Sequence, residues 1–295
     1  MIGVIGGTGL GETLFGVSGG RMHDIDTPFG RPSNPIRVVK WHGSEVALLA
    51  RHGDGHVCHP SAVPYRANIY ALKTLGVTHI LASGAVGSLR EHIPPRHLVI
   101  PDQVIDKAYG RPQTFFDQGL AVHVEFAEPF CPDLRGLLLS VAHQVETTVH
   151  SRGTYVCMEG PAFSTMAESH MHRAWGGDII GMTALPEAKL AREAEMSYAL
   201  VALVTDFDCW QPRKGDRDQH AVLEEIIGHL KAATLNAMTL MRATIEAYAI
   251  KPLPPGPIQT GLDLAVWTDR EKITPEVRQR YGVLLQRYLE AHLGN

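Results

Sequence analysis

Short apolar runs alternate with longer amphipathic segments along most of the chain. Strands are predicted where the residues are β-branched or apolar, at 2–5, 36–40, 45–50, 79–82, 98–100, 153–158 and 198–204. Helices are predicted where apolar positions follow the helical period, at 65–75, 133–145, 164–174, 185–194 and 220–250. Strands that alternate with helices are typical of an α/β fold, in which helices cover both faces of a sheet.

A proline-rich stretch marks a boundary late in the chain. Residues 251–257 hold four prolines, and proline ends a helix because it has no amide donor. We therefore expect one domain at 1–250, followed by a Pro-rich linker and a helical extension at 251–295. One further helix is predicted over 275–293. Its apolar face is formed by Val277, Tyr281, Leu284, Leu285, Tyr288 and Leu289.

The composition indicates a protein with one substantial core. Of its 295 residues, 44% are hydrophobic and 20% are charged, which excludes disordered and fibrous proteins. The formal net charge is −4 and no long Lys/Arg block occurs, so we expect no nucleic-acid or membrane partner. A secretory signal and a bilayer-spanning run are both missing from the sequence, so we expect a cytoplasmic protein. The four cysteines form no Cys-x-x-Cys pair, and we expect neither a zinc ribbon nor a redox dithiol.

Two loops that follow predicted strands carry groups suited to an anion. Gly6-Gly7-Thr8-Gly9 offers backbone amides and one hydroxyl, although a plain tight turn explains it equally well. Arg51 and His52 open the second loop, where a guanidinium group can bind two oxygens of an oxyanion together. His52, His56 and His59 also suggest a metal site. The intervening glycines break the helix that would align them, so we expect no metal site here.

Three further loops follow the same plan. Residues 83–89 are small and would let backbone amides approach a ligand, or they form a structural Gly-rich turn. The loop at 159–164 places Phe163 at a tip, where the alternative is a buried core ring. Thr183 stands between a strand and a helix, where an anion could meet the helix N-terminus or the threonine could simply cap it.

The most hydrophobic predicted strand ends in two carboxylates. Asp206 and Asp208 are two residues apart and point the same way if the backbone is extended. Partial burial would raise the pKa of at least one of them and make it a candidate acid. A solvent-exposed Asp pair is the alternative.

Taken in order, these loops resemble the methylthioadenosine phosphorylase branch of the trimeric purine nucleoside phosphorylase family. The resemblance covers about residues 1–248, and the segment 253–295 extends past the usual end of the family. Ten motifs carry it: Gly6-Gly7-Thr8-Gly9, Thr27-Pro28-Phe29-Gly30, Arg51-His52-Gly53, Tyr65-Arg66-Ala67-Asn68, Gly87-Ser88-Leu89-Arg90, Arg111-Pro112-Gln113, Ala127-Glu128-Pro129-Phe130-Cys131, Glu159-Gly160-Pro161, Gly181-Met182-Thr183 and Thr205-Asp206-Phe207-Asp208-Cys209-Trp210.

The resemblance implies a three-layer α/β/α subunit around a mixed, barrel-like sheet (the nucleoside phosphorylase fold), assembled as a homotrimer. It implies phosphorolysis of a purine nucleoside, with inorganic phosphate as co-substrate and no cofactor. Phosphate would be held by Thr8, Arg51, His52, Ala85 and Thr183. Phe163 and Met182 would pack on base and ribose, and His123 would reach into the neighbouring subunit's site.

The same resemblance implies different roles for the two carboxylates. Departure of the purine builds negative charge on the base, which an acid near N7 can quench, and Asp206 is the candidate for that acid. Asp208, if ionised, would accept a hydrogen bond from a 6-amino group. Family members specific for 6-oxopurines carry Asn at the position of Asp206 and Glu at that of Ser164.

The group at the 5′ position of the sugar is less defined. Methylthio-specific members place a small apolar residue where this chain has Gln219, and nucleoside-specific members place His there. We expect phosphorolysis of 5′-methylthioadenosine. Action on adenosine or on a broad range of purine nucleosides, including 6-oxopurine nucleosides or methylthioinosine, stays open as the alternative.

Overall fold

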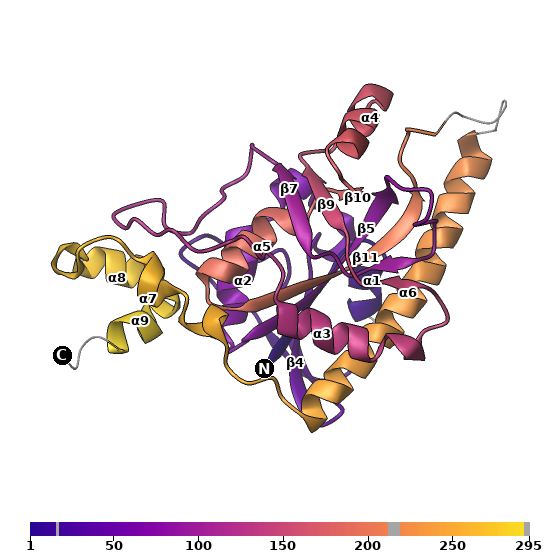
Figure 1. The fold of residues 1–295 in the computed structure, drawn as a ribbon. Coiled ribbons are helices and arrows are strands. Elements are labelled where there is room, and N and C mark those ends of the chain that lie inside the picture. Colours follow the sequence, from indigo (N-terminus) through magenta and orange to yellow (C-terminus); the bar gives the residue numbers. More distant parts are fainter. Residues whose placement is uncertain (16–17, 212–218, 292–295) are drawn as a thin grey trace.

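A mixed sheet organises the chain. A computed structural model describes residues 1–15, 18–211 and 219–291, and within these ranges eleven strands form one sheet (Figure 1). Its main path has the order β2-β3-β4-β1-β5-β10-β9-β7, and β11, β6 and β8 join it beside β5. The strands are β1 Ile2–Gly6, β2 Arg21–His23, β3 Ile36–Trp41, β4 Ser44–Ala50, β5 His79–Ser88, β6 Leu98–Val99, β7 Gln103–Lys107, β8 Val149–His150, β9 Thr154–Met158, β10 Ile179–Gly181 and β11 Ser197–Phe207.

Helices cover both faces of this sheet, which confirms the predicted three-layer architecture. Successive side chains of a strand point to opposite faces, and in β1 Val4 and Ile5 belong to two different apolar clusters. The Ile5 cluster includes residues of α2 and α5, and the Val4 cluster includes residues of α3 and α6. The helices are α1 Leu10–Phe15, α2 Tyr65–Thr74, α3 Pro132–Ser140, α4 Met166–Ala174, α5 Ala184–Glu193, α6 Gln219–Ile250, α7 Leu262–Ala265, α8 Pro275–Tyr281 and α9 Gln286–Glu290.

The sheet forks at β5, and this fork corrects one prediction. Residues 83–88, expected in a loop, continue the strand, so β5 is ten residues long. Its first half pairs in parallel with β1, its last residues pair antiparallel with β10, and β11 follows its whole length. Gly87 permits this crowding, because a Cβ there would lie 3.3 Å from Ile180 and 3.4 Å from Asp208. The small residues therefore serve close strand packing, which is the basis of the barrel-like distortion.

The C-terminal extension, residues 251–291, corrects a second prediction. The single helix expected over 275–293 is broken at Gly282, whose φ of 44° lies in the left-handed region. The predicted apolar face is nonetheless buried, as Tyr281 and Leu285 are each 0% exposed. In Figure 1 the extension forms a small lobe beside the loop that precedes α3.

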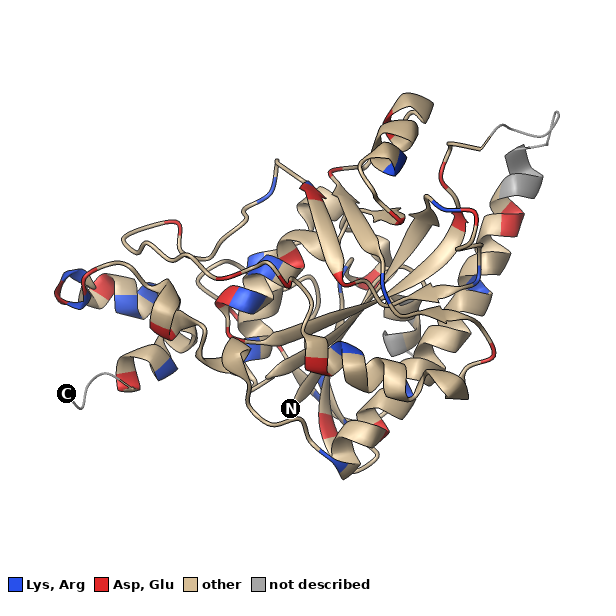
Figure 2. Ribbon diagram, in the orientation of Figure 1, with Lys and Arg blue, Asp and Glu red and all other residues tan. Residues whose placement is uncertain are grey.

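Charged residues of both signs lie along this lobe (Figure 2). Arg280 pairs with Asp117 at 3.0 Å, and Arg287 pairs with Glu195 at 2.6 Å. Val122 and Val266 form an antiparallel bridge. The extension thus packs on its own subunit along the segment 117–123.

Within the described ranges, none of the helices combines the length and apolar character that crossing a bilayer requires.

Candidate active site

The glycine loop after β1 lies against Arg51, which follows β4, and against the middle of β5. The backbone N–H of Gly7 donates to Ser83 Oγ at 3.2 Å. A Cβ on Gly7 would lie 2.5 Å from Arg51 Nη1 and 2.6 Å from the carbonyl oxygen of Ser83. Only glycine fits at this position, so the loop is more than a plain tight turn: its backbone is pressed onto two neighbouring strands.

Arg51 lies buried at the bottom of this corner. Its side chain is 0% exposed, and its Nε and Nη2 each donate to Glu187 at 2.7 Å. Its Nη1 donates to the carbonyl oxygen of Ser83 at 2.6 Å, and Tyr198 donates to Glu187 at 2.8 Å. Burial opposes the charge of Arg51, but the Glu187 carboxylate holds its pKa above the ordinary value. These bonds engage three of the five guanidinium N–H groups and leave two.

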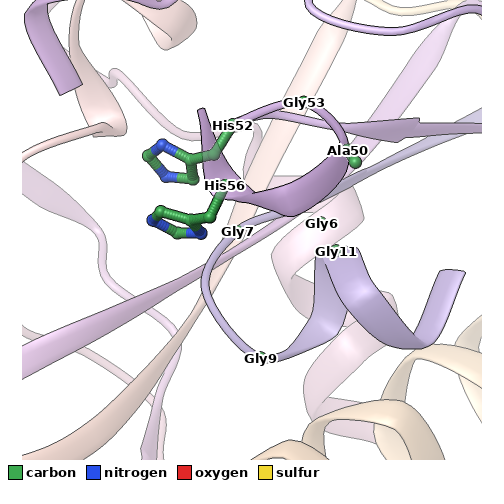
Figure 3. Close-up of a pocket in the computed structure, with 8 residues that line it drawn as sticks. All are labelled: Gly6, Gly7, Gly9, Gly11, Ala50, His52, Gly53 and His56. Carbon is green, nitrogen blue, oxygen red and sulfur yellow. The ribbon is translucent and has the colours of Figure 1, made fainter. Parts of the chain in front are cut away.

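His52 and His56 line a small hollow with the glycine loop. Figure 3 shows their rings stacked over Gly7, and the ring centroids are 4.3 Å apart. His52 Nδ1 lies 2.8 Å from the carbonyl oxygen of Cys58. Burial, and then the charge of Arg51, lower the pKa of His52 to about 4. His52 is therefore neutral near pH 7, with Nδ1 donating to Cys58 and Nε2 left as the second ring nitrogen.

Thr183 faces this corner from the end of β10. Its side chain makes no capping hydrogen bond to α5, which removes helix capping as its explanation. Its Oγ1 lies 3.5 Å from where a Cβ on Gly84 would stand. The structure thus brings the glycine loop, Arg51, His52 and Thr183 to one edge of the sheet, with Thr8 and Ala85 partly exposed beside them.

The two carboxylates follow a bulge in β11 at Thr205. Asp206 accepts a hydrogen bond from Thr205 Oγ1 at 2.6 Å, and burial raises its pKa to about 6. The backbone N–H of Asp208 donates to Ser88 at 2.9 Å. Asp208 Oδ2 is buried and has no hydrogen-bond partner among the described residues. The pair is therefore no solvent-exposed pair, because each carboxylate has a distinct, partly buried setting.

The loop between β9 and α4 adjoins the second carboxylate. Cys209, next to Asp208, donates from Sγ to the carbonyl oxygen of Ser164 at 3.2 Å. Phe163 is 85% exposed, so it is no core ring. A Cβ on Gly160 would lie 2.5 Å from Met182 Sδ, which shows that Met182 packs over this loop.

One predicted site residue, His123, is not brought into this group. His123 is exposed, and its ring lies 4.7 Å from Trp267 of the C-terminal extension. Gln219 is the first residue of α6, but its side chain lies outside the part that the structure describes.

Sequence reasoning missed the partners of Arg51. Glu187 is 136 residues away along the chain, and nothing local indicates the pair except a carboxylate in an otherwise apolar stretch. Ser83 was noted only as part of a loop, yet its hydroxyl accepts from Gly7. No group of three or more His, Cys, Asp or Glu side chains within the described ranges is arranged to hold a metal ion.

Comparisons with known proteins show the family to which the chain belongs. Residues 1–246 match the model of the phosphorylase superfamily. A protein of a Synechocystis species named S-methyl-5′-thioadenosine phosphorylase is 44% identical over 97% of this chain and 87% of its own length. The crystal structure of a methylthioadenosine phosphorylase from an antarctic soil metagenomic library superposes with a TM-score of 0.87 at 43% identity, covering 96% of this chain and 98% of that one.

A third relative is more distant. A point variant of the adenosine/methylthioadenosine phosphorylase from Schistosoma mansoni, in complex with methylthioadenosine, has a TM-score of 0.77 at 35% identity and covers 85% of this chain and 92% of that one.

The first two matches extend into residues 253–295. The prediction that this segment lies past the usual end of the family is therefore wrong for those relatives.

We expect His52 to make folding sensitive to mild acid. Its pKa falls from the ordinary 6.5 to about 4 on folding, so the stability present above pH 6.5 is lost as the pH falls toward 4. His52→Gln, which keeps a donor for the Cys58 carbonyl, should flatten this loss. Urea unfolding of both proteins at several pH values across that window measures it, with the exposed His59→Gln as control. Parallel stability curves for the wild type and His52→Gln would contradict the assignment.

Proposed function

Because the chain belongs to the phosphorylase superfamily, we propose that it is an S-methyl-5′-thioadenosine phosphorylase. The enzyme cleaves 5′-methylthioadenosine with inorganic phosphate and releases adenine and 5-methylthioribose 1-phosphate. One structural observation supports this above all: an anion-suited corner and two unlike carboxylates stand at neighbouring strand ends of one sheet.

We propose that phosphate binds at the corner of the glycine loop. Its contacts would be Thr8, His52, Ala85 and Thr183, with Arg51 beneath them. Neutral His52 can accept a hydrogen bond at Nε2 from a phosphate O–H without adding charge. Arg51 supplies positive potential from below. One of its two remaining N–H groups can donate to the anion only if the anion lies directly against the glycine loop. Phosphate held here stabilises the positive charge that develops on the sugar.

The carboxylates would act on the base. With a pKa of about 6, Asp206 keeps a proton at near-neutral pH more readily than an ordinary aspartate and can deliver it toward N7 as the base departs. The buried, unpartnered Oδ2 of Asp208 is an acceptor that a 6-amino group would satisfy. Phe163, Ser164 and Met182 would line the base and the ribose.

Adenosine is the second candidate substrate. The Schistosoma mansoni relative is named as an adenosine/methylthioadenosine phosphorylase. The polar Gln219 stands where the 5′ group is expected, and an amide can bind a 5′-hydroxyl but gains little from a thioether.

The assembly would be a homotrimer in which His123 serves the neighbouring site. Its exposure, and its position beside the C-terminal extension and away from the strand ends that form the corner, support a role across a subunit boundary. We further propose that residues 1–250 form the catalytic domain. The cysteines, all of them free, suit the reducing cytoplasm, where we propose the enzyme works.

A substrate panel tests the proposed function. Methylthioadenosine, adenosine, methylthioinosine, inosine and guanosine are incubated with and without phosphate, and free base is quantified. We expect adenine from methylthioadenosine only when phosphate is present. Equal release without phosphate would indicate a hydrolase, and turnover restricted to the 6-oxo substrates would refute the role of Asp208.

Asp206→Asn tests the leaving-group acid. Loss of the proton donor should lower kcat by about 10²- to 10⁴-fold. In the wild type, kcat/KM should fall as the pH rises through about 6, because the folded-state carboxyl loses its proton there. Asp206→Asn should lack this limb, whereas Asp208→Asn should retain it and lose preference for 6-amino bases. Phosphate titrates equally in every variant, so an unchanged pH profile in Asp206→Asn would sink the assignment.

Mixing of two defective variants tests the shared site. His123→Ala and Asp206→Asn subunits are each expected to be weakly active. In a mixed trimer, a site that takes Asp206 from one subunit and His123 from its neighbour is intact, so activity should return after subunit exchange. Mixing His123→Ala with the His123→Ala/Asp206→Asn double variant should restore nothing. Failure of the first mixture to recover, with exchange shown by mass measurement, would place His123 in its own subunit's site or outside the site.

A further inference from the structure

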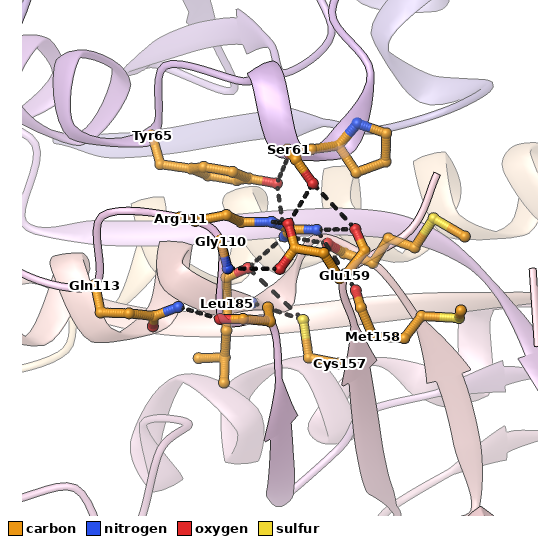
Figure 4. Close-up of polar contacts among 12 residues, drawn as sticks. Ser61, Tyr65, Gly110, Arg111, Gln113, Cys157, Met158, Glu159 and Leu185 are labelled. Carbon is orange, nitrogen blue, oxygen red and sulfur yellow. Dashed lines mark hydrogen bonds and ion pairs between the residues drawn. The ribbon is translucent and has the colours of Figure 1, made fainter. Parts of the chain in front are cut away.

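One arginine outside the residues assigned above bonds to two separate segments of the site. Arg111 follows β7 and is 4% exposed. Its Nη1 donates to the carbonyl oxygens of Met182 and Leu185, and its Nη2 donates to the carbonyl oxygen of Glu159. Figure 4 shows the guanidinium group among these partners. A single planar group therefore joins the end of β9 to the turn between β10 and α5.

That turn needs an outside donor. Leu185 has φ −119° and ψ 142°, which is extended backbone inside the span of α5. Buried carbonyl groups require hydrogen-bond partners, and an interrupted helix turn does not supply them. The other donor to the Leu185 carbonyl is Cys157 Sγ at 3.6 Å, and a thiol is a weak donor. Arg111 is thus the strong donor for the turn that carries Met182 and Thr183.

The Glu159 carboxylate extends the connection to the phosphate side. Its Oε1 accepts from Arg111 Nε at 3.2 Å and from Ser61 Oγ, and its Oε2 accepts from the backbone N–H of Gly110 at 3.0 Å. Burial raises the pKa of Glu159, but these bonds together hold it below the ordinary value. Ser61 belongs to the segment that continues the His52 loop. The arginine and the carboxylate therefore tie together the loops on both sides of the proposed substrate.

We propose that Arg111 is a positioning residue that fixes the phosphate-side turn at Met182 and Thr183 against the base-side loop at 159–164. The inference rests on the phosphorylase function proposed above. Arg111 acts through backbone carbonyls and does not touch the substrate. Its planar fork bonds to two strand ends at once, which the compact ammonium group of lysine cannot do in the same geometry.

Arg111→Ala, assayed in the full-length enzyme with methylthioadenosine and phosphate, tests this role. Displacement of bound groups by about 1 Å can cost on the order of 100-fold in rate, and we expect kcat/KM for phosphate to fall by about that factor. Because Thr183 moves, the KM for phosphate should rise by about tenfold, while the pH limb assigned to Asp206 stays in place. Guanidinium ion, added at concentrations that do not unfold the wild type, should restore part of the lost rate by filling the vacated site.

Arg135→Ala is the matched control. Arg135 lies on α3 and also donates to backbone carbonyl oxygens, those of Pro101 (2.9 Å) and Ser151 (2.6 Å). Its loss should lower the temperature of unfolding without changing the phosphate KM or responding to guanidinium. An Arg111→Ala enzyme that behaves in the same way as this control would overturn the proposal.

Arg111→Lys carries the test if Arg111→Ala does not fold. It keeps the charge but loses the fork, and we expect a raised phosphate KM. Wild-type values of KM and kcat in Arg111→Lys would also overturn the proposal. An inactive wild-type enzyme would instead count against the proposed function, so the two failures are distinguishable.

Discussion

The ion pair between Arg51 and Glu187 is the constraint on which the phosphate-side corner depends. Both side chains are almost fully buried, and an unpaired charge in that position would cost several kcal/mol. The pair fixes the end of β4 to α5, and hydrogen bonds with Ser83 and Tyr198 add β5 and β11 to the same point. The glycine loop is pressed directly onto this group. The end of β4, the middle of β5, the start of β11 and the first turn of α5 are thereby held together by one buried ion pair, and the anion-suited hollow lies beside it.

The two carboxylates show how the same side chain takes on different roles. Asp206 accepts a hydrogen bond from Thr205 Oγ1 and is buried enough to raise its pKa to about 6, whereas Asp208 has a buried oxygen with no hydrogen-bond partner among the described residues. The bulge at Thr205 separates their settings, since it shifts the register of β11 against β5. Two carboxylates with different surroundings therefore lie two residues apart at the end of β11.

Much of the fold was predictable because its signals are local. The buried strands and the long helix α6 show clear apolar patterns. Their predicted ends differ from the observed ends by only a few residues. The short strands β2 and β8 have too few residues to show a pattern. The sequence predicts a loop in place of the second half of β5, because glycine and alanine occur both in turns and in closely packed strands. The break at Gly282 was missed for the related reason that an apolar face can continue across a change of backbone direction.

The site residues divide in the same way, into those with a local sequence signal and those without one. Local sequence makes Thr183, His52 and the Asp pair candidates because they follow predicted strands, and the family resemblance supplies their expected roles. The partners that orient the site, Glu187 for Arg51 and Glu159 for Arg111, come from distant segments and leave no local trace. The packing of the C-terminal extension has a related consequence during synthesis. Ala121 is held by Thr268, which is 147 residues later, so at a synthesis rate of roughly 5–20 residues per second the segment with His123 waits on the order of 7–30 s for its partners. The strands of the sheet, which end at residue 207, can therefore pair before the segment with His123 completes its packing against residues 266–268.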